Sequence, residues 1–189
     1  ISGAGQQKHF CRLCFLKSLA NRNNPRRFLE VLPGYFSYFR EREAKFEGME
    51  NYFIIVGSLA GGTGSGCILD VAQILKYHLE EKRALSSSTI IGISILSEAF
   101  STTFRPLSSL QWNLIQSNCV ATMREIHRFL ILRGQGYPFY EYKGNWNPSP
   151  PLTDKKMPFD VYYLLDGTRP SGGDNLTSFK EELTVFPAV

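Results

Sequence analysis

The feature that most constrains this chain is a glycine-dense segment, Ala60–Gly66, whose sequence is AGGTGSG. It follows Tyr52–Val56, a continuous apolar run rich in β-branched residues, which is typical of a strand buried on both faces. After the segment, apolar residues recur at helical spacing from Ile68 to about Ala84. The pattern predicts a strand, a glycine loop and a helix. Because glycine lacks a Cβ, we expect positive φ angles in the loop and close approach of a ligand to its main chain.

The remainder of the chain predicts two further buried strands and several helices. We expect strands over Thr89–Leu96 and Phe159–Leu165, and helices over residues 6–20, from Pro25 to an interruption at Pro33–Gly34, onward towards Gly48, and over Leu107–Arg133. This order predicts an α/β fold, a three-layer, Rossmann-like parallel sheet with right-handed crossovers and helices on both faces. Ligands of such sheets bind beyond the carboxyl ends of the strands, where the loops Ala60–Gly66, Ser97–Pro106 and Asp166–Asn175 converge.

The length of 189 residues fits one domain of ordinary size. We expect residues 134–158, rich in Pro, Gly, Asn and Tyr, to form a surface insertion, and residues 171–189 to begin a further helix. No apolar run approaches the roughly 18 residues of a membrane span and no signal peptide is recognised, so we expect a cytoplasmic protein without a membrane span. Ile1 in place of a methionine suggests a piece of a longer protein.

Charge and cysteine content argue against some classes of function. The net charge of +4 arises within residues 1–50, which suits an anionic ligand or partner surface but falls short of the clustered basic stripe that binds nucleic acid. Cys11 and Cys14 form a single C-x-x-C with no second ligand pair, so we expect no zinc site and reduced cysteines. The 3 histidines are widely spaced, and no Ser-His-Asp or Cys-His catalytic set is recognised.

The glycine segment is best explained as a binding site for phosphate. Amides at a helix start carry partial positive charge, Thr63 and Ser65 add hydroxyl donors, and no acidic residue opposes an anion. No Lys precedes Ser65, which excludes a P-loop, and G-x-G-x-G is one residue short of the dinucleotide fingerprint. Two alternatives remain: a dinucleotide-binding oxidoreductase, in which Glu98 holds a ribose hydroxyl, and a turn that only packs a helix on a sheet. If the segment binds phosphate, Gly64→Val should fill the phosphate position.

The segment resembles the signature of the tubulin/FtsZ family, G-G-G-T-G-[ST]-G, with Ala60 in place of the first glycine. Gly3-Ala4-Gly5, followed by Arg12, resembles the family's G-A-G-x-x-x-x-x-G-R segment, in which Cys11 replaces the last glycine. Phe159–Asp166 looks most like the corresponding strand of divergent tubulin-like proteins of prokaryotes. The order of elements agrees as well, so the chain resembles a partial tubulin-like domain.

This resemblance implies a GTP-binding domain of a self-assembling GTPase, with GTP or GDP as the ligand and Mg²⁺ as the accompanying cation. Ala4 and Gly5 would face the γ-phosphate, Glu98 or Arg105 the ribose, and Asn175 the guanine. The remaining phosphate contacts would come from Gly61, Gly62, Thr63, Gly64, Ser65 and Gly66.

By the same resemblance, the first strand and its glycine loop would precede Ile1, and the loop that carries the catalytic acids would follow Val189. That loop acts on the nucleotide of a neighbouring subunit, so the resemblance implies head-to-tail homo-oligomers or filaments. It assigns no catalytic residue and no metal ligand to this chain. If Arg12 only braces its helix, Arg12→Ala should weaken binding less than Gly64→Val does. A non-hydrolysing scaffold of the same fold is a further alternative.

Overall fold

The computed structural model describes residues 7–20, 28–80, 85–100, 108–131, 137–138, 153–154 and 157–166. Its helices are α1 (Lys8–Ala20), α2 (Phe28–Glu43), α3 (Gly62–Glu80), the 3-10 helix η1 (Ser97–Phe100) and α4 (Ser109–Ile131). Its strands are β1 (Asn51–Ser58), β2 (Ser88–Ile95), the short β3 (Tyr137–Pro138) and β4 (Thr153–Asp154), and β5 (Val161–Leu165). The helix predicted to begin within residues 171–189 lies outside the described residues.

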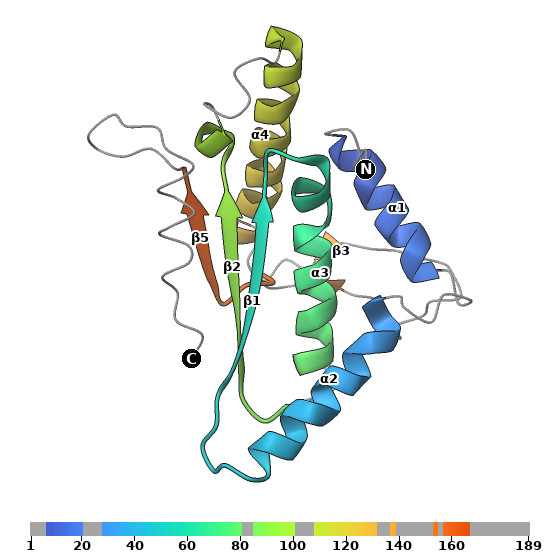
Figure 1. Cartoon of the computed structure of the whole chain (residues 1–189), viewed down its shortest axis with the longest axis vertical. Coiled ribbons are helices and arrows are strands. Elements are labelled where there is room, and N and C mark those ends of the chain that lie inside the picture. Colours follow the sequence, from blue (N-terminus) through green and yellow to red (C-terminus); the bar gives the residue numbers. More distant parts are fainter. Residues whose placement is uncertain are drawn as a thin grey trace.

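Three of the strands form one parallel sheet in the order β1-β2-β5 (Figure 1). Along the chain, α3 lies between β1 and β2, and α4 lies between β2 and β5. The predicted α/β fold with an open, Rossmann-like parallel sheet is thereby confirmed. The short strands β3 and β4 pair with each other in antiparallel orientation. Both lie in the region that the sequence predicts as a surface insertion.

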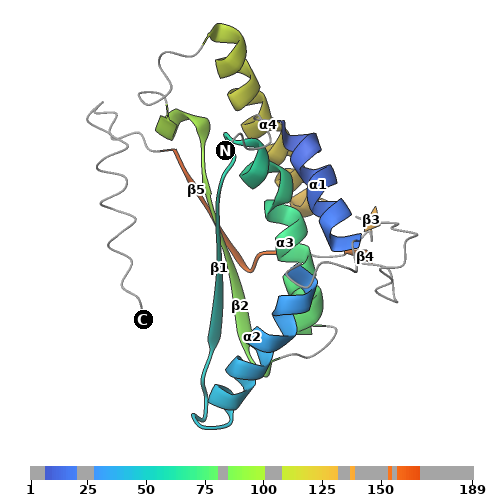
Figure 2. The same cartoon turned by 45° about the vertical axis from the view of Figure 1, so that its right-hand side comes forward.

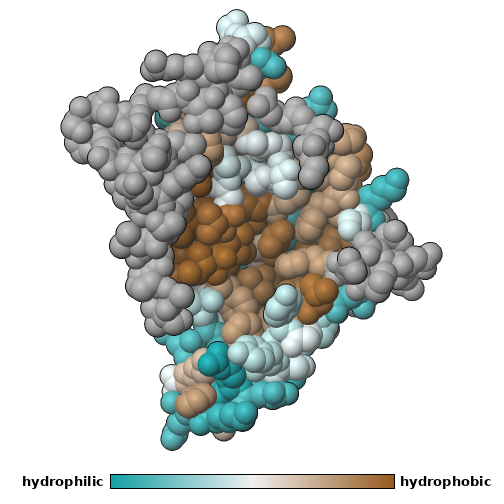
Figure 3. All heavy atoms as spheres, viewed as in Figure 1, coloured by the Kyte–Doolittle hydropathy of each residue, from teal (hydrophilic) through white to brown (hydrophobic). Residues whose placement is uncertain are grey.

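The described helices that pack on the sheet lie on one of its faces. Figure 2 shows α1, α3 and α4 on the same side of the three strands. Phe53 and Ile55 of β1 pack against the core, whereas Tyr52, Ile54 and Val56 are 55–58% exposed. An apolar patch over the strands results (Figure 3). The prediction that this strand is buried on both faces is therefore wrong for the described residues, because the pleat turns alternate side chains towards the helices and away from them.

The core lies between the sheet and the helices α3 and α4. Ile74 of α3, Ile90 of β2 and Ile115 of α4 are each at most 2% exposed. Burial of a side chain of this size contributes about 1.5–3 kcal/mol to folding. This packing fixes α3 relative to the end of β1, the place from which the glycine segment starts.

The second helix runs further than the sequence pattern predicts, because α2 continues through Pro33 and Gly34. A proline inside a helix removes one hydrogen bond and crowds the preceding turn. Leu32 and Phe36 on either side are buried, and the Phe36 ring lies 6.3 Å from that of Phe53 in β1. Packing of these side chains outweighs the local cost of the proline, which itself faces solvent.

The last long helix, α4, lies close to its predicted bounds. Ile115, Cys119 and Ile126 are buried, whereas Leu110, Leu114, Val120 and Met123 are 39–69% exposed, so apolar residues lie both on the core-facing side of α4 and on an exposed side. In the described ranges, no helix combines the length and the hydrophobicity that crossing a membrane requires.

Candidate functional site

The glycine segment, residues 60–66, lies at the edge of the sheet where all three parallel strands end. Leu59 N donates to Ile95 O (2.9 Å) and Leu96 N donates to Leu165 O (2.8 Å), so the residues that follow the strands are held side by side. The segment, η1 and Asp166 therefore share the carboxyl edge of the sheet (Figure 1). Ligands of open parallel sheets bind at this edge.

Helix α3 begins inside the glycine segment, at Gly62, earlier than the sequence pattern predicts. Ser65 N donates to Gly61 O (3.2 Å), which is the first main-chain bond of the helix. The amides of Gly62, Thr63 and Gly64 precede that bond and have no carbonyl partner within the helix. The first turn also contains no acidic residue. The segment thus presents the positive end of a helix dipole, an arrangement that favours an anion.

Two of the glycines allow helix α3 to pack closely on neighbouring elements. A Cβ at Gly64 would lie 2.2 Å from Ser58 O of β1, and a Cβ at Gly66 would lie 2.5 Å from Lys8 O of α1. A Cβ at Gly61 would have no atom within 4 Å. None of these three glycines has the positive φ that the sequence analysis expected. The lack of a Cβ at Gly64 lets α3 pack closely on β1, and at Gly66 it lets α3 pack closely on α1.

The expectation for Gly64→Val changes accordingly. A valine side chain would collide with the main chain of β1, so the variant would disturb the fold instead of only filling a phosphate position. A side chain at Gly61 would meet open space, so a substitution there separates ligand access from packing.

The two hydroxyl groups of the segment differ in their surroundings. The Ser65 side chain is 2% exposed and its hydroxyl donates to Gly61 O (2.6 Å). Its proton is thus used to close the first turn of α3, in contrast to the donor role expected for a ligand. Thr63, two residues earlier in the chain, is exposed. The hydroxyl that faces outward from this turn is that of Thr63.

Two polar side chains of α4 contact main-chain carbonyl groups of the glycine segment. Asn118 Nδ2 donates to Ala60 O (3.3 Å), and Thr122 Oγ1 lies 3.2 Å from Ser65 O. Thr122 is fully buried. Sequence reasoning missed both residues. The available signal was that they stand four positions apart on the core-facing side of the predicted helix, where polar side chains need a partner.

Helix α1 is fastened to the same region by charged groups. Arg12 and Asp70 of α3 form a two-bond ion pair, Nε to Oδ2 at 3.0 Å and Nη2 to Oδ1 at 3.1 Å. Lys8 Nζ donates to Glu125 Oε2 (2.6 Å) and Thr122 Oγ1 (2.9 Å) of α4. Burial lowers the pKa of Lys8, and the bond to Glu125 opposes that effect. The two cations therefore serve contacts between helices.

The other predicted site residues are placed only in part. Glu98 lies in η1, is exposed and accepts a hydrogen bond from Ser97 Oγ (2.8 Å). It shares the carboxyl edge of the sheet with the glycine segment. Four predicted site residues fall outside the described residues: Ala4, Gly5, Arg105 and Asn175. Within the described part of the chain, no group of three or more His, Cys, Asp or Glu residues could hold a metal ion.

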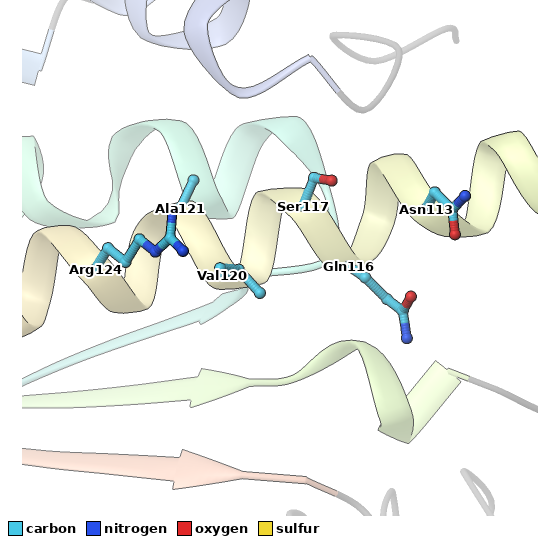
Figure 4. A pocket seen from close by; sticks show the side chains of 6 residues that line it. All are labelled: Asn113, Gln116, Ser117, Val120, Ala121 and Arg124. Carbon is cyan, nitrogen blue, oxygen red and sulfur yellow. The ribbon is translucent and has the colours of Figure 1, made fainter.

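A shallow hollow of about 370 Å³ lies along α4. Its lining side chains come from successive turns of that helix (Figure 4). They are Asn113, Gln116, Ser117, Val120, Ala121 and Arg124. None of the predicted site residues belongs to this hollow.

Comparison with known proteins agrees with the signature in the glycine segment. A family model described as "Tubulin like" matches residues 1–183, nearly the whole chain. Comparisons with curated proteins and with solved structures gave no match. The chain belongs to the tubulin-like family.

Proposed function

We propose that this chain supplies a GTP- or GDP-binding part of a tubulin-like, self-assembling, cytoplasmic GTPase. The observation that carries the proposal is the glycine segment of a tubulin-like chain, which turns into the start of α3 at the carboxyl edge of a parallel sheet. Open space at Gly61 and a first turn without acidic residues support an anionic ligand there.

In this proposal the phosphates are bound mainly by main chain. Their oxygens accept hydrogen bonds from the amides of Gly62, Thr63 and Gly64 and from the Thr63 hydroxyl. A hydrogen bond to an ionised oxygen contributes about 1.5–3 kcal/mol, so a few of them dominate the affinity for a nucleotide. Ser65 and Gly66 keep the turn and the neighbouring helices in place and do not need to touch the ligand.

The remaining contacts are assigned by the family resemblance. Glu98 accepts a hydrogen bond from a ribose hydroxyl, with Arg105 as the other candidate there. Ala4 and Gly5 face the γ-phosphate, and Asn175 contacts the base. Mg²⁺ accompanies the phosphates, and the proposal assigns it no ligand from this chain. Hydrolysis depends on a neighbouring subunit that docks head to tail.

Nucleotide selectivity tests the proposal. Thermal unfolding of the full-length protein is measured with GTP, GDP, ATP and NAD, each in the presence of Mg²⁺. A ligand at 100 times its Kd adds about 2.7 kcal/mol of stability, which raises the Tm of a chain of this size by roughly 5–10 °C. We expect this shift with the guanine nucleotides. Equal protection by ATP contradicts guanine recognition, and protection by NAD together with bound nicotinamide absorbance favours the oxidoreductase alternative.

A further inference from the structure

Two thiols from different helices meet beside the glycine segment. Cys11 Sγ on α1 lies 3.3 Å from Cys67 Sγ on α3, although the two residues are 56 positions apart in the chain. Both cysteines are free and both are partly exposed. Cys11 Sγ also lies 4.0 Å from Thr63 O, in the first turn of α3. Cys14 is exposed and Cys119 is buried, so the four cysteines differ in their surroundings.

The closeness of the two thiols follows from how α1 and α3 pack. Gly66, next to Cys67, lets the helices approach until a Cβ at that position would lie 3.3 Å from Cys11 Cβ and 2.5 Å from Lys8 O. The ion pair between Arg12 and Asp70, which follow Cys11 and Cys67 closely in the chain, holds the same two helices together. A disulfide bond is about 2.05 Å long, so the sulfur atoms need to approach by roughly 1.2 Å. Closing this gap requires rotation about the two Cα–Cβ bonds and a slight movement of the helices.

We propose that Cys11 and Cys67 form an oxidation-sensitive dithiol that hydrogen peroxide converts into an intramolecular disulfide. The first thiol attacks one peroxide oxygen, the O–O bond breaks, and a sulfenic acid and one water molecule result. The second thiol then attacks the sulfenic sulfur and expels the hydroxyl group as water. In total two S–H bonds and one O–O bond are broken, one S–S bond forms, and peroxide is reduced to two water molecules.

Burial, together with the neighbouring Cys11 thiol, raises the pKa of the Cys67 thiol. Either thiol can react with peroxide first, and the other thiol loses its proton as it attacks the sulfenic sulfur. The resulting bond ties α1 to the first turns of α3, next to the glycine segment.

The test uses the full-length protein treated with hydrogen peroxide under native conditions. Remaining thiols are alkylated, and the peptides are mapped by mass spectrometry without reduction. We expect a peptide pair joined through Cys11 and Cys67, lighter by two hydrogen atoms than the separate peptides and lost after treatment with dithiothreitol. The oxidised protein should melt higher than the reduced protein by roughly 5–10 °C, because the bond closes a long loop in the unfolded chain.

Cysteine variants provide the matched controls. Cys11→Ser and Cys67→Ser should each abolish the linked peptide and the shift in Tm. Cys14→Ser changes an exposed cysteine on the same helix as Cys11 and should retain both. The proposal is overturned if peroxide oxidises Cys14 or links two molecules while Cys11 and Cys67 stay unlinked. The peptide map is made on the protein without substitutions. It therefore shows whether Cys11 and Cys67 become linked even if a serine variant fails to fold.

Discussion

At the scale of single residues, two glycines three positions apart have different surroundings. Gly64 is in contact with β1, since a Cβ there would meet Ser58 O at 2.2 Å, whereas Gly61 borders open space. Neither has a positive φ, so backbone conformation does not explain either residue. The same residue type therefore permits close packing at one position and leaves room for a ligand at the other.

Alanine at each of these positions should separate the two effects. Gly64→Ala should lower the free energy of unfolding by about 1–3 kcal/mol, because its methyl group forces α3 away from β1. Gly61→Ala should change stability by less than about 0.5 kcal/mol but weaken the protection by GTP, because the methyl group enters the space in front of the turn. Urea unfolding, with and without GTP, measures both. A stable Gly64→Ala protein would contradict the packing role, and unchanged protection of Gly61→Ala would place the phosphates elsewhere.

At the scale of elements, the start of α3 depends on contacts with α1 and α4. Asp70 is 1% exposed, and its carboxylate accepts two hydrogen bonds from the Arg12 guanidinium. Removing one partner of a buried ion pair costs about 3–5 kcal/mol, whereas replacing both partners with apolar residues costs much less. Variants of this pair therefore test whether the packing of α1 against α3 is needed to keep the start of α3 in place.

We expect Arg12→Met to destabilise the protein by roughly 3 kcal/mol and the double variant Arg12→Met/Asp70→Leu to recover much of that loss. Lys17→Met serves as the control, because Lys17 is an exposed cation on the same helix. Midpoints of urea unfolding give the comparison. If Arg12→Met is no less stable than Lys17→Met, the ion pair does not hold α1 in place.

Local sequence patterns predicted the elements better than the contacts between them. The strands after Asn51 and Ser88 and the helix α4 follow from apolar runs and spacing, which depend on near neighbours. The passage of α2 through Pro33 does not, because it depends on the packing of Phe36 against Phe53. The same holds at the site: Asn118 reaches Ala60 across 58 positions, so no local pattern could pair them.

At the scale of the whole molecule, the sheet explains why apolar runs were misread as two-sided burial. β1 alternates between side chains packed on the helices and exposed ones, yet its exposed positions are also apolar. A run such as Tyr52–Val56 therefore identifies a strand without revealing which layers cover it. The α/β topology and the carboxyl edge followed from the order of elements, because right-handed parallel connections leave few arrangements.

Assembly is the property of the proposed function that a single molecule cannot display. Contacts that repeat head to tail without closing into a ring produce filaments. If the next subunit completes the catalytic site, the nucleotide is hydrolysed only in the assembled form. Phosphate release by the full-length protein, measured across a range of protein concentrations with GTP, should then show a threshold above which the rate per molecule rises. Light scattering in the same samples should rise at the same concentration. A rate per molecule that is constant at all concentrations would contradict completion of the site by a neighbour. Protection by GTP without phosphate release at any concentration would instead favour a non-hydrolysing scaffold of the same fold.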